Sequence, residues 1–268
     1  MSPIFIEDPA DPRLDDFRDL KKSDAADRRL VIAESPLGVE RLLESRFPTR
    51  AIVGFGGRLR SFLETHEIPE NIPVYEISRE TLAEVAGFDM HRGLVASADR
   101  AEELSIAEIL ETATTLCVLE GVGDHENIGS IFRNAAGLSV DAVLFGAGCA
   151  DPLYRRSVRV SMGHALRLPF AHFPGKTTNW QLGLDRLREA GFRIISMTPN
   201  PEAVSLREAM ADNPEKVAFL IGAEGPGLTE HAMRATDVRA RIPMAPGTDS
   251  LNLATAAAIA FYERLSLL

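Results

Sequence analysis

The sequence predicts an α/β protein whose main part is a mostly parallel β-sheet with helices on both faces. Short apolar runs alternate with amphipathic stretches over most of the chain, which is typical of strand–helix alternation. Of the 268 residues, 45% are hydrophobic and 25% charged, which leaves ample material for a core. No period of about 20–50 residues repeats, so a solenoid is excluded.

Residues 1–28 are charged and contain three prolines, so we expect a loosely held arm or a first short helix. Residues 29–99 then predict a small α/β domain. Its expected strands are 30–33, 51–54, 74–77 and 93–98, and its expected helices are 38–45, 58–65 and 78–86. Ser78, with Glu80 and Thr81 behind it, is a typical helix start.

Residues 100–113 are polar and charged at their start, and we interpret them as a linker or first helix before a second domain at 114–268. The alternation resumes there. Its expected strands are 115–119, 142–145, 168–173, 192–196, 217–221 and 239–242, and its expected helices are 127–137, 155–163, 179–190 and 252–267. Trp180, Leu184 and Leu187 recur at helical spacing and predict one buried stripe.

The formal net charge of −10 at pH 7 gives no overall sign of nucleic-acid binding, so any RNA contact must come from local patches. The densest group of cations is Arg155, Arg156 and Arg159, with Arg167 close behind. Arg58 and Arg60 form a second group. Each group is either a nucleic-acid contact or a solvated helix face.

Two cysteines, Cys117 and Cys149, suggest neither a disulfide framework nor a zinc site, and we expect no metal. The first eight residues lack the basic and apolar regions of a secretion signal. No apolar run approaches the roughly 18 residues of a membrane span. These features predict a soluble protein in a reducing cytoplasm.

Three segments follow apolar, strand-like runs and carry the clearest functional signal. They are Asn127 to Gly137, Ile221 to Gly227, and Ile242-Pro243-Met244 continued by Ser250 to Leu253. The last segment opens directly into an Ala-rich helix. Loops at strand ends of an α/β sheet make a small-molecule pocket.

In order and spacing, the three segments resemble the motifs of the SpoU/TrmH branch of the SPOUT RNA methyltransferases. The match covers residues 114–268, and residues 29–99 resemble the L30e-like, RNA-binding domain that many members carry. The resemblance implies a deep carboxy-terminal trefoil knot, a fold otherwise essentially absent from proteins. It also implies a homodimer that binds S-adenosylmethionine and methylates a ribose 2′-hydroxyl of ribosomal or transfer RNA.

The resemblance assigns catalytic parts to five residues: Asn127, Arg133, Glu224, Ser250 and Asn252. An arginine stays protonated at working pH, so we expect Arg133 to stabilise a developing alkoxide and bind an RNA phosphate. Without the motif, Arg133 would be interpreted as a surface helix cation paired with a neighbouring acid. Asn127, Ser250 and Asn252 could each be a helix cap, and Glu224 a loop acid in water.

The family pattern places cofactor contacts at Gly222, Ile242 and Leu251, with Thr198 in a wall of the pocket. Ile242 and Leu251 could otherwise be core residues. For RNA binding we expect the two arginine groups, that is Arg58, Arg60, Arg155, Arg156 and Arg159. One departure precedes Asn127, because His125 and Glu126 follow Asp124 where relatives often have a proline.

Two other functions compete with this one. A dinucleotide oxidoreductase is suggested by glycine pairs at 54/56, 121/123 and 146/148, but none continues as G-x-G-x-x-G. An RNA- or ribosome-binding protein that has lost catalysis is disfavoured, because all five catalytic candidates are present together. The sequence lacks the motifs of serine hydrolases, zinc proteases and nucleoside triphosphatases.

Overall fold

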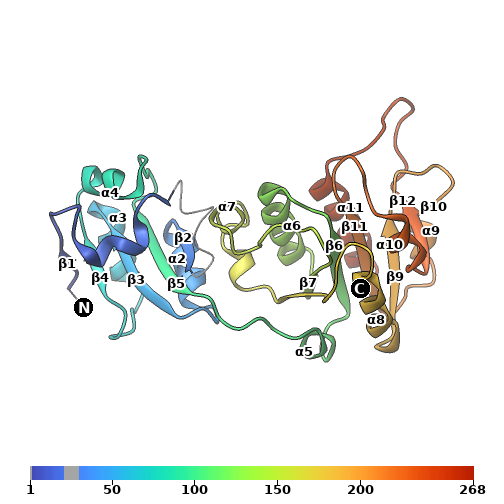
Figure 1. The fold of residues 1–268 in the computed structure, drawn as a ribbon, viewed down its shortest axis with the longest axis horizontal. Helices are drawn as coiled ribbons and strands as arrows, with labels where there is room; N and C mark the ends of the chain where they lie inside the picture. The colour runs from blue at the N-terminus through green and yellow to red at the C-terminus, as the bar shows by residue number, and fades with distance from the viewer. Residues whose placement is uncertain (1, 21–29) are drawn as a thin grey trace. The chain divides into compact units, whose positions relative to one another are not determined.

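The computed structural model describes residues 2–20 and 30–268, and these form two compact units. Unit 1 comprises residues 1–102 together with 152–167, and unit 2 comprises 103–151 together with 168–268. Figure 1 follows the chain from the blue N-terminus to the red C-terminus. The boundary expected between residues 28 and 29 lies outside the described residues.

Unit 1 contains a mixed five-stranded sheet. In spatial order its strands are β1 (Ile4–Phe5), β4 (Val74–Glu76), β3 (Thr49–Gly54), β5 (Leu94–Asp99) and β2 (Leu30–Glu34). β5 runs antiparallel to both β2 and β3, whereas β3, β4 and β1 are parallel. The connecting helices are α2 (Pro36–Leu43), α3 (Gly56–Thr65) and α4 (Arg79–Ala86), and Ser78 caps α4 as expected.

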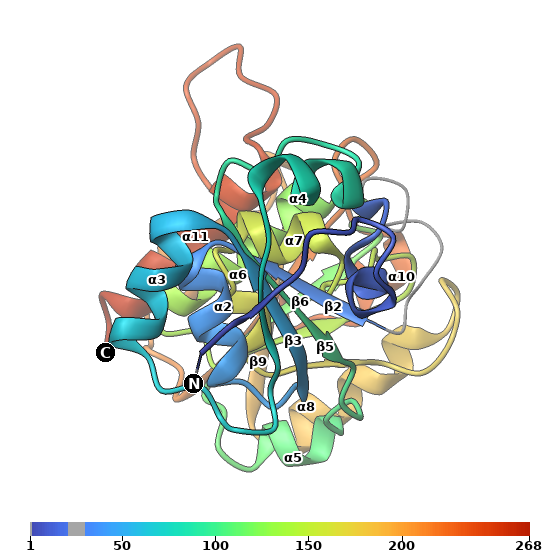
Figure 2. The ribbon, with the colours of Figure 1, turned by 90° about the vertical axis from the view of Figure 1, so that its left-hand side faces the viewer.

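The N-terminal segment is packed on this sheet and forms a short helix, which is the second of the two alternatives expected for it. Its 3-10 helix η1 (Pro12–Phe17) buries Leu14 and Phe17 completely in the unit 1 core. The Asp16 carboxylate accepts hydrogen bonds from Arg50 Nε at 2.8 Å and Ser97 Oγ at 2.8 Å. In Figure 2 this dark blue segment crosses in front of the sheet.

The segment 152–167 belongs to unit 1, although we expected it within the second domain. It forms α7 (Arg155–Val160) and the short η2 (His164–Leu166). Arg155 makes an ion pair with Glu34 of β2, and both side chains are largely buried. Arg41 of α2 donates a hydrogen bond to the Met162 carbonyl at 2.6 Å.

Unit 2 is built on a seven-stranded sheet in which every described strand pair is parallel, as the alternation predicted. In spatial order its strands are β10 (Val204–Ser205), β12 (Val238–Arg241), β9 (Phe192–Met197), β11 (Lys216–Gly222), β6 (Thr115–Glu120), β7 (Ala142–Phe145) and β8 (Phe170–His172). After β6 the chain adds β7 and β8 on one side of that strand. It then crosses to the other side of β6, where β9 and β11 lie.

Helices cover both faces of this sheet. On one face, Phe132 of α6 (His125–Gly137) and Phe261 of α11 (Leu253–Leu265) lie against Phe145 and Phe219 of the strands. The other face buries residues of the remaining helices in one apolar cluster. These helices are α5 (Ile106–Leu110), η3 (Trp180–Leu184), α8 (Asp185–Glu189) and α10 (Glu230–Arg234), while α9 (Leu206–Ala209) follows β10.

The predicted stripe of Trp180, Leu184 and Leu187 is confirmed, because all three side chains are fully buried. The expected helix 179–190 is instead a 3-10 helix followed by a short α-helix. The first helix expected as one alternative for residues 100–113 is present as α5. The short helices α9 and α10 were not predicted, since each spans only four or five residues. The trefoil knot implied by the resemblance stays a prediction.

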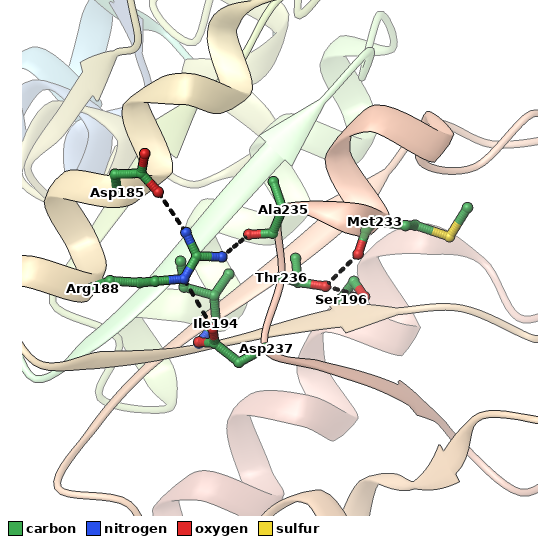
Figure 3. Close-up of polar contacts among 8 residues, drawn as sticks. All are labelled: Asp185, Arg188, Ile194, Ser196, Met233, Ala235, Thr236 and Asp237. Carbon is green, nitrogen blue, oxygen red and sulfur yellow. Dashed lines mark hydrogen bonds and ion pairs between the residues drawn. The ribbon is translucent and has the colours of Figure 1, made fainter.

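A polar network joins β9 to the residues that precede β12, as Figure 3 shows. Asp237 accepts hydrogen bonds from the Ile194 backbone at 2.8 Å and from Arg188 Nε at 2.9 Å. The fully buried Ser196 hydroxyl lies 2.9 Å from that of Thr236. These bonds fix the relative position of two strands whose carboxyl ends lead into the candidate site.

Candidate active site

The carboxyl ends of β9, β11 and β12 and the start of α11 enclose a cavity of about 380 Å³. The position follows from topology, because ligands of open α/β sheets bind beyond the carboxyl ends of the strands near a reversal of strand order. The lining residues are Met197, Thr198, Pro199, Ile221, Gly222, Ala223, Glu224, Gly225, Gly227, Ile242, Met244, Ser250, Leu251, Asn252, Leu253 and Ala256.

All four residues expected to contact the cofactor line this cavity: Thr198, Gly222, Ile242 and Leu251. Ile242 is half-buried and Leu251 exposed, so neither is an ordinary core residue. Sequence reasoning missed Met244, although it lies in a recognised motif, and Ala256, which lies one turn inside α11. The helical spacing of Ala256 from Leu253 was the available signal.

The loop after β11 turns back on itself so tightly that Gly222 has no room for a side chain. A Cβ there would lie 2.3 Å from the Gly227 carbonyl carbon and the Leu228 nitrogen. The Gly227 amide donates to the Ala223 carbonyl at 3.0 Å, which closes the turn. Gly225 and Gly227 have φ values of 82° and 69°, a region that glycine adopts without strain.

Residues from the three sequence motifs meet beside the cavity through their side chains. Glu224 Oε1 accepts hydrogen bonds from Asn127 Nδ2 at 3.1 Å and Asn252 Nδ2 at 2.9 Å. Asn252 Nδ2 also lies 3.0 Å from Asn127 Oδ1, which accepts its second hydrogen bond. Glu224 and Asn252 lie 97 and 125 residues after Asn127 in the chain, so only the fold brings the three side chains together.

The two asparagines differ in that only one of them caps a helix. Asn252 is the N-cap of α11, since its Oδ1 accepts from the backbone of Ala254 at 3.0 Å and Thr255 at 3.2 Å. Asn252 therefore combines capping with the motif contact. Asn127 is not a cap, because α6 begins at His125 and Asp124 caps it. The absence of the usual proline before Asn127 thus leaves a well-formed helix start.

Arg133 lies on α6 with an exposed side chain and does not line the cavity. No hydrogen bond or ion pair joins it to another residue in the described ranges 2–20 and 30–268. The structure therefore brings together four of the five catalytic candidates, Asn127, Glu224, Ser250 and Asn252, and leaves Arg133 apart. An exposed guanidinium remains available to a ligand.

The arginines expected to bind RNA differ in their surroundings. Arg58 and Arg60 of α3 are exposed, and Arg58 Nη1 donates to the Arg92 carbonyl at 3.0 Å. Arg156 is also exposed, and Arg159 is half-buried. Arg155 faces inward, because it pairs with Glu34 and its guanidinium lies 5.0 Å from the centre of the Phe88 ring. An RNA contact by Arg155 does not fit this internal ion pair.

Neither cysteine is a reactive thiol. Burial raises the pKa of Cys117 well above its usual range and that of Cys149 to about 11. Among the residues that the structure describes, no group of three His, Cys, Asp or Glu side chains is placed to hold a metal ion. No described helix is long and apolar enough to cross a membrane.

Comparison with known proteins adds sequence evidence. The model of the SpoU rRNA Methylase family matches residues 114–262. A Mycobacterium tuberculosis protein named uncharacterized tRNA/rRNA methyltransferase is 55% identical over 263 residues, covering 96% of this chain and 90% of that protein. A 23S rRNA (guanosine-2′-O-)-methyltransferase of Ralstonia nicotianae is 30% identical over 213 residues, covering 77% of this chain and 81% of that protein.

Solved structures share the fold. An rRNA methyltransferase from Sinorhizobium meliloti, bound to S-adenosylmethionine (AdoMet), has a TM-score of 0.78 at 23% identity and covers 97% of this chain and 96% of its own. A SpoU methyltransferase from Streptomyces viridochromogenes, in complex with the same cofactor, has a TM-score of 0.78 at 20% identity. It covers 96% of this chain and 98% of its own.

Proposed function

The chain belongs to the SpoU rRNA methylase family, and from this premise we propose that it transfers a methyl group from S-adenosylmethionine to a ribose 2′-hydroxyl of ribosomal or transfer RNA. One observation carries the proposal. Asn127, Glu224 and Asn252, one from each motif, form a single hydrogen-bonded cluster at the rim of the cavity beyond the strand ends of unit 2.

The cavity suits the proposed cofactor in size and chemistry. Its volume lies within the range of about 300–1,000 Å³ that is usual for small-molecule sites. Backbone groups of the Gly222 loop and the apolar side chains of Ile242 and Leu251 offer the slot that an adenine needs. The Glu224 carboxylate lines the cavity, where it would balance the positive charge of a sulfonium.

The cofactor supplies an already activated methyl group, so the protein must align the ribose oxygen and manage its proton. Of the two carboxylate oxygens of Glu224, only Oε1 accepts hydrogen bonds from the asparagines. No hydrogen bond from a described residue reaches Oε2. Glu224 is thereby held in one orientation with an acceptor left for substrate. We propose that Arg133 stabilises the developing alkoxide and binds a neighbouring phosphate.

Unit 1 is proposed as the part that delivers RNA, in line with its predicted L30e-like character. Exposed arginines on α3 and the exposed Arg156 supply positive charge in a chain whose net charge is −10. Because phosphate contacts release counterions, this binding should weaken as salt rises. Because its proposed substrates are ribosomal or transfer RNA, we propose that the protein acts in the cytoplasm.

We further propose a homodimer that covers part of α11. The Tyr262 side chain on this helix is 63% exposed, and Ala258 and Ile259 beside it are only half-buried. A helix that is apolar on more than one side fits burial against a second surface. Sedimentation equilibrium at micromolar concentration tests this, since a species of 29.2 kDa alone would contradict it.

The asparagine cluster gives a sharp test with a matched control on the same helix. Asn127→Ala removes a bond to Glu224, whereas Asn134→Ala removes a 2.9 Å bond to the Ala254 carbonyl, which ties α6 to α11 outside the cluster. In single-turnover assays we expect the first change to slow methyl transfer by about 100-fold or more, and the second to leave it within a few-fold. Equal effects would contradict the catalytic role of the cluster.

A further inference from the structure

A buried carboxylate that the sequence motifs do not include lies at the carboxyl end of β6, beside the start of the loop that lines the site. Glu120, the last residue of β6, is 3% exposed and does not line the cavity. Acidic side chains are almost never buried this fully unless they are paired. Among the described residues Glu120 makes no ion pair, so hydrogen bonds alone stabilise it.

Four neutral donors surround the two oxygens of Glu120. Oε1 accepts from Trp180 Nε1 at 2.7 Å, from Thr229 Oγ1 at 3.0 Å and from Gln181 Nε2 at 3.2 Å. Oε2 accepts from the Thr229 backbone nitrogen at 2.8 Å. The side chain of Glu120 thus uses both of its oxygens as acceptors.

The place of Glu120 in the sheet explains what this network holds. Its Cα is paired in register with that of Gly222, where the loop after β11 begins. Thr229, where the loop gives way to α10, donates two of the four bonds. Glu120 therefore joins the start of the loop to its end, and the loop between them carries Glu224 and much of the cavity lining.

We propose that Glu120 is a positioning residue for the methyl-transfer site. It fixes the span of the 222–229 loop, and through that loop the place of Glu224 and the shape of the cofactor slot. The same network includes Trp180, the only tryptophan in the chain. Intrinsic tryptophan fluorescence consequently reports on the loop, although Trp180 does not line the cavity.

The inference rests on the proposed cofactor site and is tested with the full chain. Glu120→Gln keeps the side-chain shape but turns one acceptor into a donor, which must then face one of the four donors. We expect S-adenosylmethionine to bind at least tenfold more weakly by calorimetry. We also expect methyl transfer at saturating cofactor to fall at least tenfold, because Glu224 loses its place as well.

Asp141→Asn is the control for general loss of stability. Its Oδ2 accepts three bonds, from the Thr114 nitrogen and hydroxyl and from the Thr115 nitrogen, at the amino end of β6 and so away from the cavity. This variant should keep wild-type cofactor affinity and turnover at temperatures where it is folded. If Glu120→Gln matched it in both measurements, the positioning role would be refuted.

Fluorescence supplies a readout that a purely structural role would not move. In the wild type, S-adenosylmethionine should change the Trp180 emission, and Glu120→Gln should abolish that change at cofactor concentrations that saturate the variant. A change of wild-type size in the variant would overturn the link between the loop and Trp180. Failure of the wild type to bind the cofactor at all would instead overturn the proposed site and this role with it.

A second pair of variants decides the matter if Glu120→Gln does not fold. Thr229→Val removes the hydroxyl while keeping the shape, and Thr229→Ser retains the hydroxyl. The serine variant should bind S-adenosylmethionine as the wild type does, and the valine variant several-fold more weakly. Equal affinities for the two variants would overturn the proposal.

Discussion

Replacing Gly222 by alanine tests the geometry of the cofactor loop with the smallest possible addition. The new methyl carbon would lie 2.3 Å from two backbone atoms and 2.7 Å from the Gly227 oxygen. Carbon atoms approach comfortably only to about 3.5 Å, so the loop must move by about 1 Å. The obstacle is backbone rather than a flexible side chain, so no rotamer change relieves it.

The size of the effect follows from that displacement. Overpacking of this kind costs about 1–3 kcal/mol. Gly222 and Gly227 both line the cavity, so the strain falls on the atoms that would hold the cofactor. Since about 1.4 kcal/mol corresponds to a factor of ten in affinity, we expect S-adenosylmethionine to bind roughly 10- to 100-fold more weakly.

Gly123→Ala is the matched control. Gly123 also follows the end of a strand, but a Cβ there would meet nothing within 4 Å, and its φ is not positive. Calorimetric titration of both variants with S-adenosylmethionine should show weak binding for Gly222→Ala and wild-type binding for Gly123→Ala. Wild-type affinity in Gly222→Ala would refute both the tight loop and its place in the cofactor site.

Three further predictions concern catalysis, RNA binding and thiol chemistry. Arg133→Ala should slow single-turnover methyl transfer by about 100-fold or more with cofactor affinity unchanged, and Arg133→Lys should restore little, because an ammonium lacks the planar fork of a guanidinium. Joint replacement of Arg58 and Arg60 by Ser should weaken RNA binding and flatten its dependence on salt, as filter binding at several salt concentrations will reveal. Cys149, whose pKa is raised to about 11 by burial, should alkylate slowly at pH 8 and about tenfold faster per pH unit up to pH 10; a plateau near pH 8 would contradict this.

The sequence predicted the second unit better than the first. Its strands are short, continuous apolar runs, and each motif directly follows one of them, so fold, cavity and lining residues could be expected together. The family resemblance was confirmed by the match over residues 114–262. The roles of the individual site residues stay predictions, although four catalytic candidates and all four cofactor candidates lie where the cavity is.

What escaped prediction depends on contacts between distant residues. The arginines at 155–159 were expected to bind RNA, but Arg155 pairs with Glu34, which lies 121 residues away in the chain. The charged residues near the N-terminus left a loose arm and a short helix as alternatives. The choice depends on distant contacts, because Arg50 and Ser97 bind Asp16 and the neighbouring apolar side chains pack in the core. The residues around Glu120 in the sequence do not indicate its role, because its four hydrogen-bond donors come from two other parts of the chain.

The activity proposed for this chain is methylation of a ribose 2′-oxygen of RNA. The most direct measurement incubates the purified protein with methyl-labelled S-adenosylmethionine and separated ribosomal and transfer RNA, digests the RNA to nucleosides, and identifies the labelled product by mass spectrometry. We expect label in one nucleoside from one RNA, with the methyl group on the ribose, and transfer about 100-fold slower or more with Arg133→Ala. Label on a base, or no transfer to either RNA, would contradict it.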